Sequence, residues 1–205
     1  MRYDPLKRGL DVAVALPAAI LTLPIQIGIG VAVRATLGSP VLFRQLRPGK
    51  DESAFELLKF RSMRAPAFPG ESDAVRLTNF GSFLRSTSLD ELPSLWNVVR
   101  GDMSIVGPRP LLMEYLPLYS PQQRRRHEVR PGITGLAQVS GRNNTTWEQR
   151  FAHDISYVDQ RSLGLDLQIV WRTVATVLRR DGISAQGEAT MPHFTGSVGP
   201  LAEEA

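Results

Sequence analysis

The longest apolar stretch of the chain is LDVAVALPAAILTLPIQIGIGVAV, residues 10–33. Its only polar side chains are those of Asp11, Thr22 and Gln26. At about 1.5 Å of rise per residue, a helix of this length could cross the hydrocarbon core of a bilayer. The stretch is too long for the apolar part of a signal peptide, and no small-residue cleavage site clearly follows it. A membrane segment is therefore predicted, and the alternative is a buried core helix of a soluble protein.

The charges and prolines of this segment predict how it meets the membrane. Basic residues stand on both sides of it, namely Arg2, Lys7 and Arg8 before it and Arg34, Arg44 and Arg47 after it. Positive charge marks cytoplasmic ends, so both ends are expected on the same side. Pro24 removes a backbone donor near the middle, and the Thr22 hydroxyl could satisfy a freed carbonyl. A simple transmembrane helix fits the length, but a re-entrant helix hairpin also explains the charges and Pro24.

The composition is that of a folded chain with a slight basic excess. Among 205 residues, 42% are hydrophobic, and 24 Lys+Arg against 20 Asp+Glu give a net charge of +4. The absence of cysteine excludes disulfides, thiolate zinc sites and a cysteine nucleophile. The net charge would suit phospholipid surfaces, phosphorylated substrates or nucleic acid, and does not distinguish them.

The pattern beyond residue 38 predicts a mixed α+β fold. Residues 41–43 and 55–60 form short apolar or alternating runs around a turn at 47–51, which indicates a β-hairpin. An exposed loop is expected at 64–74, and ordered loops without regular elements at 101–111 and 129–142. Helices are expected over four segments: 75–85, the residues after Ser88, 146–160 and 165–180.

The densest group of chemically active side chains is at Asp90 and Glu91. Ser88 can cap a helix whose first turn holds both carboxylates, and taken alone this pair is more often an ordinary helix start. A carboxylate can also attack phosphorus or ligate a hard divalent cation. Either role requires phosphate-binding groups nearby.

Such groups are present in four places. Arg109 stands between two prolines, and Lys59 and Arg61 alternate with Phe60 on the predicted second strand. Residues 130–135 and 141–143 combine arginine with glycine. Each cluster alone would be a turn with a surface ion pair, but four in one small domain favour anion binding. Neither a P-loop nor a dinucleotide fingerprint occurs.

Taken together, these runs resemble the small monotopic phosphoglycosyl transferases, a bacterial sugar transferase family that starts polyprenol-linked glycan assembly. The matching runs follow in the expected order: Lys7-Arg8 with Asp11, then 42–49, 59–63, 85–92, 95–110, 130–135 and 141–143.

The resemblance implies three parts. Residues 1–36 would form a re-entrant membrane helix, broken at Pro24, and residues 37–186 a mainly helical cytoplasmic catalytic domain with a short β-hairpin and interfacial amphipathic helices. Residues 187–205 would form an extended tail. The family often has serine before the proline of the break, where this chain has Leu23, and Thr22 would substitute for it. The enzyme would lie on the cytoplasmic face of the bacterial inner membrane.

The resemblance also implies a double displacement. Asp90 would attack the β-phosphate of a UDP-sugar, releasing UMP and forming a covalent phosphosugar intermediate that polyprenyl (undecaprenyl) phosphate then attacks. Glu91 would help to place Mg²⁺ or manage a proton, and both carboxylates are candidate metal ligands. The candidate phosphate and nucleotide contacts are Lys59, Arg85, Arg109 and Arg142. The tail sequence Phe194-Thr-Gly196 resembles that of members using N-acetylated UDP-sugars.

Two other function classes compete with this hypothesis. A membrane-anchored, metal-dependent phosphohydrolase would release sugar phosphate or inorganic phosphate even without a lipid acceptor. A non-catalytic basic module would bind nucleic acid or anionic lipid without turnover. The carboxylate pair argues against the second, because acidic groups repel a phosphate backbone, and no nucleic-acid partner is expected.

Overall fold

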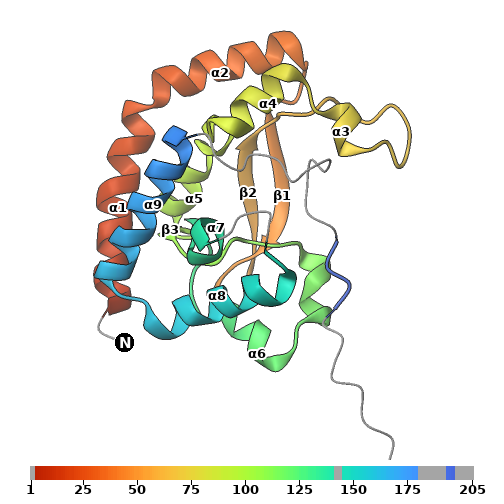
Figure 1. Cartoon of the computed structure of the whole chain (residues 1–205). Coiled ribbons are helices and arrows are strands. Elements are labelled where there is room, and N and C mark those ends of the chain that lie inside the picture. Colours follow the sequence, from red (N-terminus) through yellow and green to blue (C-terminus); the bar gives the residue numbers. More distant parts are fainter. Residues whose placement is uncertain (1–2, 141–144, 180–192, 197–205) are drawn as a thin grey trace, which may run out of the picture.

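The computed structural model describes residues 3–140, 145–179 and 193–196. It opens with two helices, α1 (Tyr3–Leu21) and α2 (Leu23–Thr36), which meet at an angle of 58° and frame one side and the top of the molecule (Figure 1). No single helix of the described ranges is long and apolar enough to cross a bilayer, whereas this bent pair together has the length and composition. The prediction of a broken apolar segment is confirmed.

The bend falls at Thr22, two residues before Pro24. Pro24 lies in the first turn of α2, where its missing N–H leaves no hydrogen bond unmade. The Thr22 hydroxyl contacts the carbonyls of Ala18 at 2.7 Å and Ala19 at 3.3 Å. Gln26 Nε2 donates to the Ala19 carbonyl at 3.3 Å and to Thr22 Oγ1 at 2.9 Å. Two polar side chains therefore bind the Ala19 carbonyl at the break. Helix α1 also contains Pro17 and continues through it.

The predicted β-hairpin is confirmed. Strands β1 (Leu42–Pro48) and β2 (Ala54–Phe60) pair antiparallel, with a 3₁₀ turn η1 (Lys50–Glu52) between them. Helix α5 (Ser94–Arg100) covers the other edge of β2 with side chains instead of a third strand. Asn97 Oδ1 accepts from Leu58 N at 3.1 Å, and Ser94 Oγ donates to Leu58 O at 2.7 Å. These bonds satisfy an edge that would otherwise leave backbone groups unpaired.

The single helix expected over 75–85 is wrong, because the segment contains two helices. Met63 forms an isolated antiparallel bridge with Leu77, which separates α3 (Asp73–Arg76) from α4 (Asn79–Ser86). The Thr78 hydroxyl then caps α4 by accepting from Gly81 N at 3.0 Å. The loop that precedes α3 extends away from the body of the molecule (Figure 1).

The expectation of loops without regular elements at 101–111 and 129–142 is also wrong. Strands β3 (Ser104–Val106) and β4 (Gly132–Thr134) pair in parallel, and α7 (Leu136–Ser140) follows. Their close approach requires glycine, since a Cβ on Gly107 would lie 2.4 Å from the Arg130 carbonyl oxygen. Short helical turns connect the two strands: η3 (Met113–Leu118), α6 (Pro121–Arg124) and η4 (Arg125–Glu128).

The two later amphipathic helices are confirmed as α8 (Trp147–Gln160) and α9 (Leu163–Arg179). Thr146 and Gln149 form a capping box that starts α8. Helix α9 buries Ile169 in the core and exposes Leu167 and Trp171, so it has both a core face and an apolar solvent face. The structure is mostly helical with two small sheets, in agreement with a mixed α+β fold.

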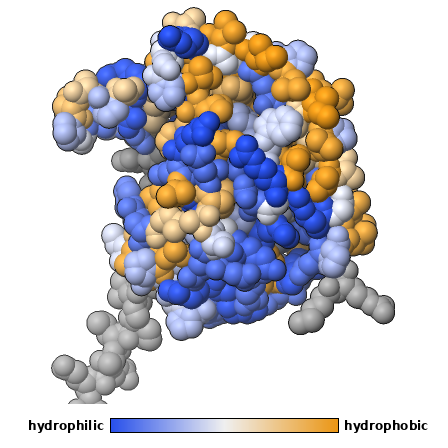
Figure 2. Space-filling view, turned by 180° about the vertical axis from the view of Figure 1, so that it is seen from behind, coloured by the Kyte–Doolittle hydropathy of each residue, from blue (hydrophilic) through white to orange (hydrophobic). Residues whose placement is uncertain are grey.

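The outer surface of the bent pair is apolar. Figure 2 shows hydrophobic residues gathered over α1 and α2, and the most exposed of them are Leu21, Val31, Ile27, Val14 and Leu6. The inner face of α1 combines buried alanines, Ala15 and Ala19, with polar groups. The buried Asp11 carboxylate accepts from Ile105 N of β3 at 3.2 Å, and Tyr3 and Lys7 both donate to Asp166 of α9. These polar residues and the small alanines attach α1 to the domain, and its large apolar side chains are on the outside.

Most of the predicted tail, residues 187–205, lies outside the described residues. The described part, 193–196, has no regular secondary structure. Phe194 is buried in an aromatic cluster with four residues of η3, its following turn and α8, namely Tyr115, Tyr119, Trp147 and Phe151.

Candidate active site

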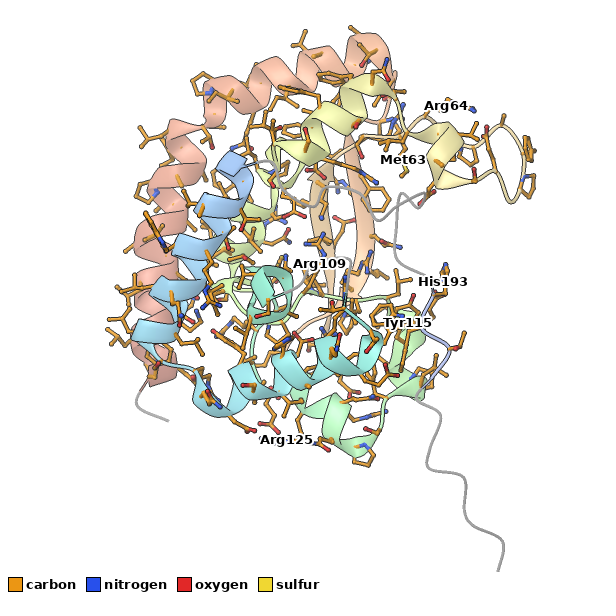
Figure 3. All side chains as sticks on the ribbon, viewed as in Figure 1. Met63, Arg64, Arg109, Tyr115, Arg125 and His193 are labelled. Atoms are coloured by element: carbon orange, nitrogen blue, oxygen red, sulfur yellow. The ribbon has the colours of Figure 1, made fainter. Side chains whose placement is uncertain are left out.

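A cavity of about 1130 Å³ opens between the hairpin, the segment before α5, the loop after β3 and helices α8 and α9. Figure 3 shows Arg109 in the middle of this region, with Tyr115 and His193 close together toward one end. Met63 and Arg64 lie toward the other end, below α2. The charged side chains of the predicted site that line the cavity are Lys59, Arg85, Asp90, Glu91 and Arg109.

Asp90 and Glu91 lie in a 3₁₀ turn, η2 (Leu89–Glu91), and the main helix α5 begins only at Ser94. The predicted Ser88 cap is wrong, because Ser88 has a left-handed backbone (φ 57°) and its side chain makes no capping hydrogen bond. Such a conformation is costly for a residue with a Cβ and is common at functional sites. The carboxylates are therefore held by the turn and by the attachment of α5 to β2, rather than by a helix start.

Glu91 is held by two cations through one oxygen. Its Oε1 accepts from Lys59 Nζ at 2.5 Å and from Arg109 Nη2 at 2.9 Å. Burial would raise the pKa of Glu91, but the charges of Lys59 and Arg109 outweigh it and lower this pKa well below the ordinary glutamate value. Glu91 is therefore a fixed anion. Its second oxygen, Oε2, has no hydrogen-bond partner among the described residues.

Asp90 has the opposite character. It is 8% exposed, lines the cavity, and makes no hydrogen bond or ion pair within the described ranges. Burial and the adjacent charge of Glu91 raise its pKa to about 6, against the attraction of Lys59, Arg109 and Arg85. A buried carboxylate that lacks donors is poorly stabilised as an anion and is correspondingly basic and nucleophilic. The two neighbouring acids are thus separated into a fixed anion and a reactive group.

The loop that carries Arg109 is gripped by two other arginines. Arg126 Nη2 donates to the Arg109 carbonyl at 2.7 Å, and Arg47 Nη1 donates to the Pro110 carbonyl at 3.3 Å. Arg126 is itself buried and pairs with Asp154 of α8 at 2.7 Å. Sequence reasoning missed Arg126 and Asp154. Arg126 belongs to a run of three arginines that resembles a solvated charged surface, so no local signal distinguished it.

Of the remaining predicted residues, Arg85 lines the same cavity and Arg142 lies outside the described residues. Arg85 Nε donates to Ser62 Oγ at 3.0 Å, which orients its terminal NH₂ groups. The structure thus brings Lys59, Asp90 and Glu91 together with Arg109, and places Arg85 at the same cavity. Thr22, Leu23 and Pro24 lie apart from it, at the bend between α1 and α2.

The donor set fits Mg²⁺ more closely than a metal that requires a full protein cage. The described ranges contain no group of three or more histidine, aspartate or glutamate side chains placed to hold a metal. Mg²⁺ often takes only one or two carboxylates and completes its octahedron with water and substrate phosphates. An oxygen of Asp90 and the unpaired Oε2 of Glu91 could supply those carboxylate ligands.

Comparison with known proteins gives consistent results. The family model described as bacterial sugar transferase matches residues 2–180. The chain is 48% identical over 198 residues to the uncharacterized sugar transferase EpsL of Bacillus subtilis, covering 94% of this chain and 96% of that relative. It is 41% identical over 194 residues to the UDP-glucose:undecaprenyl-phosphate glucose-1-phosphate transferase of Caulobacter vibrioides. This match covers 87% of this chain and 72% of that relative.

A third relative is much longer than the chain. The UDP-galactose-lipid carrier transferase of Erwinia amylovora is 40% identical over 197 residues, which are 86% of this chain but 41% of that protein.

Proposed function

Because the chain belongs to the bacterial sugar transferase family, we propose that it transfers a sugar phosphate from a UDP-sugar to undecaprenyl phosphate, with Asp90 as the nucleophile. The observation that carries this proposal is the buried Asp90 carboxylate, which has no donor of its own within the described residues. It lies beside Glu91, which is already neutralised by Lys59 and Arg109. The substrates named for the relatives from Caulobacter and Klebsiella pneumoniae agree with this reaction.

The reaction consists of two displacements at one phosphorus. An oxygen of Asp90 attacks the β-phosphorus of the donor, the bond from that phosphorus to the bridging oxygen breaks, and its electron pair leaves with UMP. A phosphate oxygen of the lipid then attacks the same phosphorus. The bond to Asp90 breaks, its electron pair returns to the carboxylate, and a lipid diphosphate sugar is released. Neither step requires a proton if the lipid phosphate reacts as its dianion.

The residues of this chain stabilise the charge that moves. Lys59 and Arg109 lie against Glu91 and beside Asp90, so they can contact the phosphate that Asp90 attacks. The prolines beside Arg109 and the hydrogen bond from Arg126 to the Arg109 carbonyl fix this loop before substrate binds. Less reorganisation of the loop is then needed during the reaction. A Mg²⁺ held by Asp90 and by Oε2 of Glu91 would neutralise the diphosphate and reduce its repulsion of the nucleophile.

The uracil base is assigned to the aromatic end of the cavity. Tyr115, Trp147 and His193 line that end together with Arg150, and aromatic faces stack on nucleobases. The donor sugar stays a prediction. The tail resemblance favours an N-acetylated sugar, whereas the relatives from Caulobacter and Erwinia are named for glucose and galactose.

The membrane role of the bent pair follows from the second substrate. The lipid keeps its chain in the bilayer and its phosphate at the surface, so the enzyme must act at that interface. We assign α1 and α2 to a re-entrant segment whose apolar outer surface lies in the lipid and whose two ends face the cytoplasm, at the inner membrane.

Turnover in nanodiscs tests the proposal. Wild-type protein with Mg²⁺, undecaprenyl phosphate and a panel of UDP-sugars labelled in the β-phosphate should move label into lipid and release UMP stoichiometrically. Asp90→Asn should lose at least 10³-fold in rate, since an amide is not a nucleophile toward phosphorus. Release of labelled water-soluble phosphate without lipid product would indicate a phosphohydrolase, and full turnover by Asp90→Asn would refute the nucleophile.

A further inference from the structure

Arg61 is a cation that the reaction described above does not use. Its Nε is buried without a partner, and no described residue accepts a hydrogen bond or forms an ion pair with its guanidinium. Arg61 also lines the cavity that contains Asp90. A half-buried guanidinium is unfavourable unless an anion binds it, because its lost hydration is not replaced. The residue is thus ready for an anionic ligand.

Strand geometry places Arg61 at a fixed distance from the reacting centre. Arg61 N donates to Val41 O at 3.0 Å and so continues the β1–β2 ladder by one residue beyond Phe60. Lys59 and Arg61 are two residues apart and therefore point to the same face, about 7 Å from each other. Lys59 binds Glu91. Arg61 therefore places a second positive charge two residues farther along the same strand face, away from Glu91.

This second position lies toward the membrane segment. A Cβ at Gly38, just after α2, would be 4.0 Å from Nη2 of Arg61. The exposed Phe43 side chain and Pro40 line the same end of the cavity. The aromatic end with Tyr115 and His193 lies away from α2, as Figure 3 shows. A phosphate bound at Arg61 can therefore carry an apolar chain that extends along the bent pair. This position suits a lipid phosphate better than a nucleotide.

Arg85 provides a second cation in the same cavity. Its Nε donates to the hydroxyl of Ser62, and its terminal NH₂ groups have no partner among the described residues. Two guanidinium groups that line one cavity can together compensate the two negative charges of a phosphate monoester.

We propose that Arg61, together with Arg85, binds the phosphate of the polyprenyl phosphate acceptor at the membrane end of the cavity. This inference rests on the proposed function and adds the position of its second substrate. Arg61 is a substrate-binding residue for the lipid, distinct from the Lys59–Glu91–Arg109 group that holds the donor phosphate.

Separate measurement of the two half-reactions tests the proposal. In nanodiscs of zwitterionic lipid, Arg61→Gln should raise the KM for undecaprenyl phosphate at least tenfold. Adduct formation from UDP-sugar without acceptor should change by less than about threefold. Arg61→Lys keeps the positive charge but loses the planar pair of donors of the guanidinium. Its KM for undecaprenyl phosphate should therefore lie between those of wild type and Arg61→Gln. Arg44→Gln is the matched control, since Arg44 is an exposed arginine of the same hairpin that pairs with Glu56.

Thermal stability without substrate separates binding from folding. Arg61 has no internal acceptor, so Arg61→Gln should not lower the Tm, and a large loss of Tm would show a structural role instead. Equal losses in adduct formation and acceptor KM would assign Arg61 to the donor, and an unchanged acceptor KM would also overturn the proposal. If Arg61→Gln changed only binding to vesicles containing anionic phospholipid, the ligand would be a lipid headgroup. Absence of any adduct in wild type would instead refute the proposed function itself.

Discussion

Asp90 and Glu91 are adjacent in sequence but have opposite electrostatic environments. Glu91 is bound by Lys59 and Arg109, which lower its pKa despite its burial. Asp90 is buried without a donor, and its pKa is raised. Asp90 lines the cavity and its negative charge is poorly stabilised, whereas the charge of Glu91 is neutralised. We therefore expect Glu91 not to replace Asp90 as the nucleophile.

The raised pKa of Asp90 predicts the acid limb of the first half-reaction. Only the carboxylate attacks phosphorus, so at limiting Mg²⁺ the rate of adduct formation should fall as the pH decreases through about 6, instead of near the ordinary aspartate value. Higher Mg²⁺ concentration should move this midpoint to lower pH, because a bound cation favours the carboxylate. Adduct formation should be measured by stopped flow or quenched flow without acceptor, so that ionisation of the lipid phosphate does not contribute to the pH profile. Glu91→Gln removes a negative neighbour and frees two cations, so its midpoint should move to lower pH. A flat wild-type profile down to pH 4.5 would contradict this assignment.

The sequence was sufficient to identify these carboxylates but not their geometry. Asp90, Glu91, Lys59 and Arg109 stand in runs with recognisable chemistry, and the structure brings them together. The left-handed Ser88 could not be predicted, because the surrounding packing imposes its conformation against its own preference.

At the scale of elements, long periodic segments were predictable and short ones were not. Helices α8 and α9 carry clear apolar periodicity. Strands β3 and β4 have three residues each and depend on glycine contacts between segments about 30 residues apart, so no local pattern reveals them. The same is true of the bridge from Met63 to Leu77, which divided an expected helix.

Helix α8 offers a direct comparison of a buried and an exposed ion pair. Asp154 pairs with Arg126, and both are nearly inaccessible to solvent, whereas Asp159 pairs with Arg125 at the surface (Figure 3). Asp154→Asn leaves a buried guanidinium uncompensated and should destabilise the fold by about 3 kcal/mol. Asp159→Asn should change stability little.

Urea unfolding of both variants measures the difference. Asp154→Asn should also slow turnover more than the Asp159 variant does, because Arg126 positions the carbonyl of Arg109. Equal stabilities for the two variants would show that the buried pair does not hold the loop.

At the scale of the whole molecule, the chain is an amphipathic body with one apolar side. The apolar outer surface of α1 and α2 is held in place by Asp11, Tyr3 and Lys7, which bind to β3 and α9. The hairpin and helices α8 and α9, which line the cavity around Asp90, lie on the inner side of this frame (Figure 1). Such an arrangement would keep Asp90 close to the membrane surface, where the lipid phosphate lies.

Cysteine accessibility tests this topology in a chain without natural cysteine. Pro5→Cys, in the first turn of α1, and Ser39→Cys, after α2, are at exposed positions near the two ends of the bent pair. Both should react with an impermeant thiol reagent only from the cytoplasmic side. Leu21→Cys at the bend should be protected by lipid. Reaction of the two flanking cysteines from opposite sides would mean that the segment spans the membrane.

A covalent intermediate on Asp90 distinguishes the proposed double displacement from direct transfer, and intact-protein mass spectrometry detects it. Wild-type protein incubated with Mg²⁺ and its UDP-sugar, without acceptor, should gain the mass of one sugar phosphate, and peptide mapping should locate it on Asp90. Undecaprenyl phosphate should then remove the adduct, and Asp90→Asn should never form it. An adduct on Glu91 or another residue, or acceptor-dependent turnover with no adduct at any time, would contradict the account.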